Sequence, residues 1–271
     1  LYSSAASDVY KRQVWDDQSM QLVWSARTDS GLRRSSNEDG WCVREDLGLF
    51  AVTDGMGGHV AGEVASRLVL EQLEHHIEDT HPAQVDAQVT LSPTPDILSG
   101  PRLDAGLLEA NQCLAREIAR DSKLQGMATT AVAVLIHDTG NAVAHVGDSR
   151  AYVYHRGELS RLTADHSWVE DQVRAGLLST ENARNHPHRN IVTRAIAGTE
   201  GLSVESSKLS LQAGDRLLLC SDGLTTVVSD SEIEAILTSN LVPGTACDEL
   251  IDRANEEGGP DNITAIVGDI L

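Results

Sequence analysis

The sequence lacks long apolar runs and is poor in basic residues. Among its 271 residues the longest purely apolar stretch, 131–136, has six, whereas a membrane-spanning helix needs about 20. Only 21 Lys and Arg stand against 41 Asp and Glu, which gives a formal net charge of −20. A nucleic-acid-binding protein needs a basic surface to replace phosphate counterions. We therefore expect no transmembrane segment, and the charge argues against nucleic acid or a membrane surface as a partner.

Cysteine is also rare. The four cysteines form neither a C-x-x-C pair nor a Cys/His cluster at zinc-ligand spacing: Cys42, Cys113, Cys220 and Cys247. This usage predicts reduced, buried thiols and a cytoplasmic location. With 41% hydrophobic residues the chain is too apolar for disorder and long enough to bury a core.

The first nineteen residues differ from the rest. Residues 1–19 contain no apolar segment of the kind that a secretory signal needs. They resemble a vector-derived translation, so we interpret 1–19 as a non-native or disordered leader with the native start at Met20. We expect residues 20–271 to form one domain.

The hydrophobic pattern predicts both strands and helices. Short apolar or β-branched runs predict strands at 47–53, 129–137, 142–146, 151–155, 216–220 and 263–267. Three- and four-residue spacings predict helices at 61–79 and 103–120, with shorter ones near 231–238 and 245–257. The polar, Pro-containing segment 81–101 predicts a surface loop, and 167–190 predicts a flap. Strand clusters around a helix pair favour an α+β fold with face-to-face sheets and outer helices.

Acidic residues occur where apolar strands stop or start. Asp54 and Asp222 each follow a predicted strand in an Asp-Gly pair, Asp148 follows another through Gly147, and Asp261 precedes the last. Any one of these is typical of a turn. Together with residues 37–39 they predict converging carboxylates, which repel one another unless a cation lies among them. An oxygen-only site favours Mg²⁺ or Mn²⁺ over zinc.

Such a site suits phosphate chemistry. Two cations about 3.5–4 Å apart would deprotonate a water for in-line attack on phosphorus. Arg34 is the candidate phosphate anchor, because a guanidinium grips phosphate oxygens with two donors. The alternative interpretation is an ordinary surface arginine in the pair Arg33-Arg34.

The sequence resembles the metal-dependent protein serine/threonine phosphatases of the protein phosphatase 2C type, in their bacterial form. The matching stretches run in the family's order: SARTDSGLRRSSNEDG (25–40), LFAVTDGMGGHVAGEVAS (49–66), MATTAVAVLI (127–136), AHVGDSRAYVYHRGEL (144–159), LTADHSWVEDQV (162–173), HPHRNIVTRAIAG (186–198), LLLCSDGL (217–224) and GGPDNITAIV (258–267). The resemblance implies a central β-sandwich of two mainly antiparallel sheets flanked by α-helices, with a small flap, so that 20–271 would be one catalytic domain.

The resemblance also implies a binuclear Mn²⁺ or Mg²⁺ site. Asp54 would bridge the two ions, and the carbonyl of Gly55 would bind one of them. Asp222 and Asp261 would complete the protein ligands of the other ion.

Further roles follow from the same resemblance. Glu38 and Asp39 would act through waters on the ions. Bacterial members often hold a third ion with the residues that match Asp148 and Asp222. Arg34 matches the phosphate-binding arginine of the family.

His59 is the candidate general acid, with the capping of a helix near residue 61 as the alternative. The implied enzyme is a monomeric, cytoplasmic phosphatase that hydrolyses phosphoserine and phosphothreonine by direct attack of a metal-bound hydroxide. Its partners would be phosphorylated proteins, the products of a Ser/Thr kinase. The rival hypotheses are a catalytically silent phosphoprotein-binding regulator and a metal-dependent phosphodiesterase. We do not expect His186 and His188, in the flap, to bind metal.

The proposed centre uses six of the acidic residues, and the rest still outnumber the basic ones. This excess predicts solubility and a preference for basic residues around the phosphorylated residue.

Overall fold

Two antiparallel sheets form the centre of the molecule. The structure, a computed structural model, describes residues 11–13, 22–57, 60–81, 98–137, 140–239 and 242–271. The first sheet has the order β1 (Lys11–Gln13), β2 (Leu22–Asp29), β12 (Ile263–Ile270), β11 (Arg216–Cys220), β8 (Arg150–His155) and β9 (Glu158–Arg161). The second has the order β10 (Glu205–Leu209), β7 (Asn141–Val146), β6 (Ala131–Leu135), β4 (Leu49–Met56) and β3 (Asp39–Arg44), with β5 (Ala128–Thr129) paired to β4.

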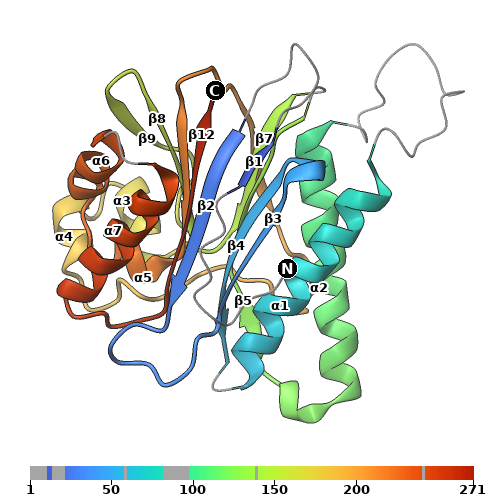
Figure 1. Cartoon of the computed structure of the whole chain (residues 1–271). Helices are drawn as coiled ribbons and strands as arrows, with labels where there is room; N and C mark the ends of the chain where they lie inside the picture. Colours follow the sequence, from blue (N-terminus) through green and yellow to red (C-terminus); the bar gives the residue numbers. More distant parts are fainter. Residues whose placement is uncertain (1–10, 14–21, 58–59, 82–97, 138–139, 240–241) are drawn as a thin grey trace, which may run out of the picture.

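Helices cover both outer faces of the sandwich (Figure 1). The pair α1 (Val60–Asp79) and α2 (Ser99–Arg120) packs on the second sheet, through β3, β4 and β7. On the first sheet α7 (Pro243–Glu256) packs against β2 and β12, with α6 (Asp230–Thr238) beside it. Shorter helical elements include α5 (Asp222–Thr225) and the 3-10 turns Glu45–Leu47 and Ser122–Leu124. The predicted α+β sandwich with outer helices is confirmed.

The central strands are buried on both faces. In β11, Leu217 and Leu219 face the other sheet, whereas Leu218 and Cys220 face the helices. Because side chains alternate along a strand, a layer on each side requires a continuous apolar run rather than an alternating pattern. This is why RLLLC reads so clearly as a strand, and β11 has the predicted bounds, 216–220.

Several predicted boundaries are wrong; strand β4, for example, ends at Met56 and not at residue 53. The predicted strand 129–137 is two strands, because β5 pairs with Gly55 and Met56 whereas β6 pairs with the earlier residues of β4. Helix α2 begins at Ser99, inside the segment expected to be a loop up to 101. Pro101 lies in its first turn, where proline is tolerated because that backbone N–H has no helical partner. Residues 82–97 of that loop lie outside the described residues.

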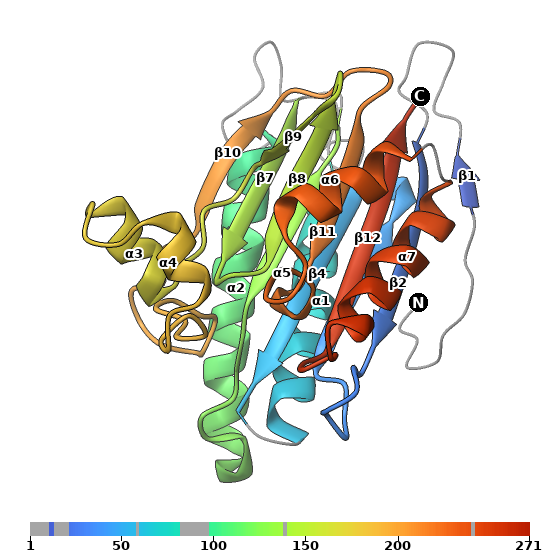
Figure 2. The ribbon, with the colours of Figure 1, turned by 90° about the vertical axis from the view of Figure 1, so that its left-hand side faces the viewer.

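A small helical unit projects from one side of the sandwich (Figure 2). It contains α3 (Trp168–Arg174) and α4 (Thr180–Arg184), which the side chains of Ser167 and Ser179 cap. Both helices lie in the segment 167–190 that we interpret as a flap. In the leader 1–19 the structure describes only β1, which pairs with residues 22–24, and the interpretation of that segment stays a prediction. No helix in the described residues is long and apolar enough to cross a membrane.

Candidate metal centre

Four predicted aspartates meet at one end of the sandwich. Asp54 lies near the end of β4, Asp148 follows β7, and Asp222 follows β11. Asp261 precedes β12, whose antiparallel pairing with β11 brings it to the end at which Asp222 lies. Together with Glu38 they line one cavity of about 450 Å³. The predicted convergence is therefore observed, for strands of both sheets.

Asp39 lies behind these residues and opposite Asp54 in the register of β3 and β4. Its Oδ2 accepts hydrogen bonds from the hydroxyls of Ser221 and Thr264, both at 2.7 Å. Its Oδ1 is buried and has no hydrogen-bond partner among the described residues. Burial, with repulsion from Asp222 and Asp261, raises the pKa of Asp39 to about 7.

The other buried carboxyls affect one another in the same way. Burial is the largest cause that raises the pKa of Asp54, followed by the charge of Asp39. Burial and the charge of Asp222 raise the pKa of Asp148, and burial and the charge of Asp261 raise that of Asp222. Asp54 also shares a hydrogen bond with Asp222. The cluster thus strongly disfavours full ionisation unless a cation compensates the charges.

The donor set fits hard divalent cations. The lining carboxylates offer only oxygen, and Asp39 Oδ1 is a buried acceptor that lacks a donor. Mg²⁺ and Mn²⁺ prefer oxygen ligands and usually keep several waters, which could donate to such an acceptor. Asp54, Asp148, Asp222 and Asp261 could hold two or three such ions.

Two glycines allow the close approach of Glu38. A Cβ at Gly55 would lie 2.2 Å from the carbonyl oxygen of Gly62, and one at Gly62 would lie 1.8 Å from Oε2 of Glu38. The backbone N–H of Gly55 also donates to the carbonyl of Glu38 at 3.2 Å. Only glycine fits at either position, which leaves the backbone of Gly55 open at the cavity wall.

Arg34, the candidate phosphate anchor, lines the cavity. Its Nη2 donates to Oδ2 of Asp261 at 2.7 Å, and the side chain of Arg34 is 55% exposed. The hydrogen bond to Asp261 is the main cause that raises the pKa of Arg34. Arg33 lines the same cavity, so both members of the pair face the site.

Little in the sequence indicates which residues support these side chains. Asn262 accepts the N–H of Glu38 at 2.8 Å and donates to the carbonyls of Ser30 and Ser36 at 3.0 and 2.8 Å. The hydroxyl of Thr130 accepts the N–H of Asp54 at 3.1 Å. The sequence signal for Thr130 is that it is a polar residue at the start of an apolar strand. The signal for Asn262 is that it follows Asp261 directly.

The candidate general acid, His59, lies outside the described residues. His186 and His188 pack against Trp168, with ring centroids 4.9 and 5.0 Å from its ring. This aromatic cluster lies within the flap and is partly exposed.

A second possible metal cluster contains His145, His166 and Glu205, whose ligand atoms lie within 4.8 Å of one another. The N–H of Gly147 donates to Nδ1 of His166 at 3.0 Å, so the neutral ring carries its proton on Nε2. Nε2 lies 3.1 Å from Oε2 of Glu205 and 3.0 Å from Nη1 of Arg194, and the positive charge of that guanidinium disfavours a cation at this nitrogen. His166 is therefore a structural link between the turn at Gly147 and β10.

Comparison with known proteins agrees with this geometry. The sequence profile of the protein phosphatase 2C family matches residues 32–262. The chain is 39% identical over 252 residues to the serine/threonine protein phosphatase PstP of Mycobacterium tuberculosis, a match that covers 92% of this chain and 45% of PstP. The chain thus spans less than half the length of that relative. It is 37% identical to the serine/threonine phosphatase stp of Listeria monocytogenes, over 89% of this chain and 93% of stp.

Solved structures show the same architecture. The crystal structure of the catalytic domain of PstP in complex with two manganese ions superposes with a TM-score of 0.78 at 36% identity, over 93% of this chain and 100% of that domain. The profile match covers most of the chain, and the two relatives are well above 30% identical. By fold, by site geometry and by sequence, the chain belongs to the protein phosphatase 2C family.

Proposed function

We propose that the chain is a metal-dependent phosphoprotein phosphatase that hydrolyses phosphoserine and phosphothreonine. The observation that carries this proposal is the cavity in which carboxylates from both sheets meet, with Arg34 at its mouth. The family membership and the manganese ions of the PstP domain support it. Two divalent ions held by these carboxylates would acidify a water and neutralise charge on the phosphoryl oxygens.

The side chains that line the cavity would hold the ions and bind the substrate. Asp54, Asp222 and Asp261 would hold the ions, and Asp148 would take part in a third site with Asp222. Asp39, which lies behind these residues, would accept hydrogen bonds from waters on the ions through its buried Oδ1. Arg34 would bind and orient the phosphoryl oxygens, because it is exposed at the mouth and has further N–H donors beside the one given to Asp261. His59 remains the proposed general acid.

We also infer that the substrates are products of Ser/Thr kinases and that the chain works as a monomer in the cytoplasm. The names of the relatives support the first point, and four free thiols support a reducing compartment. Burial raises the pKa of Cys220 and Cys247 to about 12, which suits structural rather than reactive thiols.

The direct test is an assay with p-nitrophenyl phosphate, phosphoserine and phosphothreonine peptides, mononucleotides and cyclic dinucleotides, each with Mn²⁺ and with a chelator. We expect Mn²⁺-dependent release of phosphate from the peptides. Binding of phosphopeptides without turnover at any pH would favour a silent regulator. Faster turnover of the nucleotides would favour a phosphodiesterase.

A further inference from the structure

A second cavity adjoins the metal centre beneath the flap. It has a volume of about 400 Å³ and shares Asp148, Asp222 and Asn190 with the first cavity, so the two are contiguous. Its walls come from α3 and α4 on one side and from residues 225–230, which join α5 to α6, on the other. A chain whose phosphorylated residue lies at the metal centre could therefore place a neighbouring residue here.

Arginines dominate the part of this cavity that lies away from the metal centre. Four arginines line it: Arg150, Arg161, Arg184 and Arg189. Apart from Asp148 and Asp222, its lining includes three carboxylates: Asp165, Glu170 and Asp230. The carboxylates shared with the metal centre would be compensated by its ions. The outer part of the cavity thus has a net positive charge.

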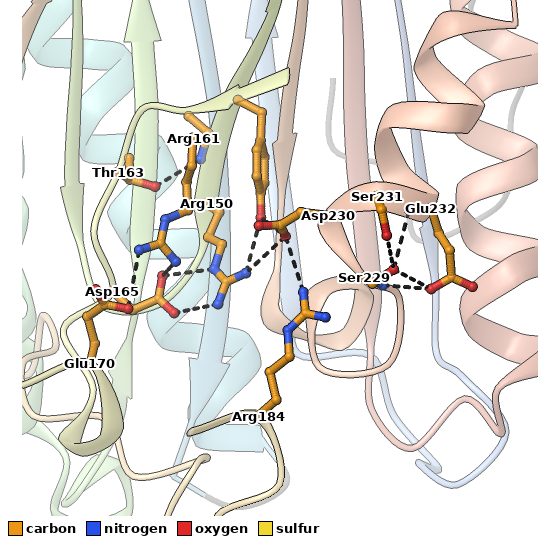
Figure 3. Close-up of polar contacts among 12 residues, drawn as sticks. Arg150, Arg161, Thr163, Asp165, Glu170, Arg184, Ser229, Asp230, Ser231 and Glu232 are labelled. Carbon is orange, nitrogen blue, oxygen red and sulfur yellow. Dashed lines mark hydrogen bonds and ion pairs between the residues drawn. The ribbon is translucent and has the colours of Figure 1, made fainter. Parts of the chain in front are cut away.

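Two of the arginines are already engaged. The partly buried guanidinium of Arg150 donates to both oxygens of Asp165, at 2.9 and 2.7 Å, and to the hydroxyl of Tyr152 at 3.1 Å. Arg161 donates to Glu170 at 3.2 Å (Figure 3). These contacts make Arg150 and Arg161 part of the wall, because their charges are compensated by fixed carboxylates.

The other two arginines have N–H donors that are available to a further acceptor. Arg184, on α4, reaches toward Asp230, but the ion pair is 3.8 Å long and both side chains are about half exposed (Figure 3). At that length it is beyond hydrogen-bond distance. Arg189 is exposed and has no ion-pair partner in the part of the chain that the structure describes. Two guanidinium groups on the flap can therefore bind an added anion.

We propose that this second cavity binds an anionic group, a carboxylate or a second phosphate, on a residue that flanks the phosphorylated one. The inference rests on the proposed phosphatase function and deepens it. Because an extended chain advances about 3.3–3.6 Å per residue and the cavities share a wall, the anionic residue lies about one to three positions away. The net charge of the whole chain favours basic flanks, but charges in contact with the substrate outweigh distant, screened ones.

The test uses phosphothreonine peptides that differ only in one flanking residue: alanine, lysine, glutamate or phosphoserine, at each of the three positions on either side. The glutamate and phosphoserine peptides separate the two sources of negative charge. At the best position we expect kcat/KM for at least one anionic peptide to exceed that of the alanine peptide about tenfold, mainly through KM, and the lysine peptide to be the poorest.

The variant Arg184→Gln/Arg189→Gln should reduce the ratio of anionic to alanine peptide to about one. Asp230→Asn removes the competing carboxylate and should raise that ratio. Arg116→Gln, an exposed arginine on α2, is the matched control and should leave it unchanged.

Fluorescence anisotropy with the same peptides and variants measures the preference without turnover. If no phosphopeptide is hydrolysed, the proposed function fails, but the binding ratios still decide on the subsite. A preference of the wild type for lysine, or an anionic preference that survives the double substitution, would overturn the inference.

Discussion

Nη2 of Arg34 donates a hydrogen bond of 2.7 Å to Oδ2 of Asp261, so the proposed phosphate anchor and a proposed metal ligand are in direct contact. The two residues are 227 positions apart in the chain, and the contact joins the loop before β3 to the loop before β12. A single hydrogen bond therefore couples the phosphate-binding and metal-binding parts of the site.

Arg34→Ala should weaken substrate binding more than metal binding. A charge-assisted hydrogen bond to phosphate contributes roughly 1.5–3 kcal/mol, so kcat/KM should fall roughly ten- to hundredfold. Steady-state kinetics and Mn²⁺ titration by calorimetry measure the two effects. Arg34→Lys should recover only part of the loss, because lysine cannot grip phosphate with two parallel donors. An unchanged KM and kcat would remove Arg34 from the substrate site.

Asp222→Asn should abolish activity while the fold survives. The asparagine keeps the shape but removes a charge that lies among Asp54, Asp148 and Asp261. In a chelator the variant should be at least as stable to heat as the wild type, because repulsion is relieved. Calorimetry should show weaker Mn²⁺ binding. Asp252→Asn, an exposed position on α7, is the control. Retention of more than about a tenth of the rate would contradict the ligand role.

The protein treated with a chelator should lose stability as the pH rises. Asp39 has a pKa of about 7 in the folded chain, well above its usual value, so the folded state binds more protons than the unfolded state between about pH 4 and 7. The free energy of unfolding then falls with pH, by about 1.4 kcal/mol per pH unit for each such proton. Thermal unfolding at several pH values measures this slope. Saturating Mn²⁺ should flatten it, and a slope of opposite sign would refute the account.

Asn262→Ala should destabilise the chain and disturb Glu38. The substitution leaves the N–H of Glu38 and the carbonyls of Ser30 and Ser36 without their partner, at a cost of about 1–3 kcal/mol. Urea denaturation measures the loss, and Mn²⁺ affinity should weaken with it. Asn182→Ala, on the exposed side of α4, should change neither quantity. Normal stability in Asn262→Ala would show that water replaces the amide.

Sequence reasoning succeeded where local pattern and burial agree. The continuous apolar run of β11 and the three- and four-residue spacing of α1 predict those elements within a residue or so. Strand β10, ESSKL, is largely exposed and, among the strands that the structure describes, pairs only with β7, so it has no hydrophobic pattern that could reveal it. Its position depends on partners that are far away in the chain.

The same distinction holds for the site. Asp54 and Asp222 were predictable because strand ends place them in an Asp-Gly pair. The roles of Thr130 and Asn262, and the contact of Arg34 with Asp261, depend on tertiary packing between distant segments. No single-sequence pattern specifies such contacts.

The origin of the carboxylates in both sheets has a mechanical consequence. Asp54 and Asp148 extend from one sheet and Asp222 and Asp261 from the other, so an ion held between them would cross-link the two sheets. Any sliding of one sheet over the other would change the distances between the carboxylates. The apolar seam that resists such slip, built from Val132, Val134, Leu217 and Leu219, lies between the sheets. Packing in the middle of the sandwich thus determines how precisely the carboxylates are placed at its end.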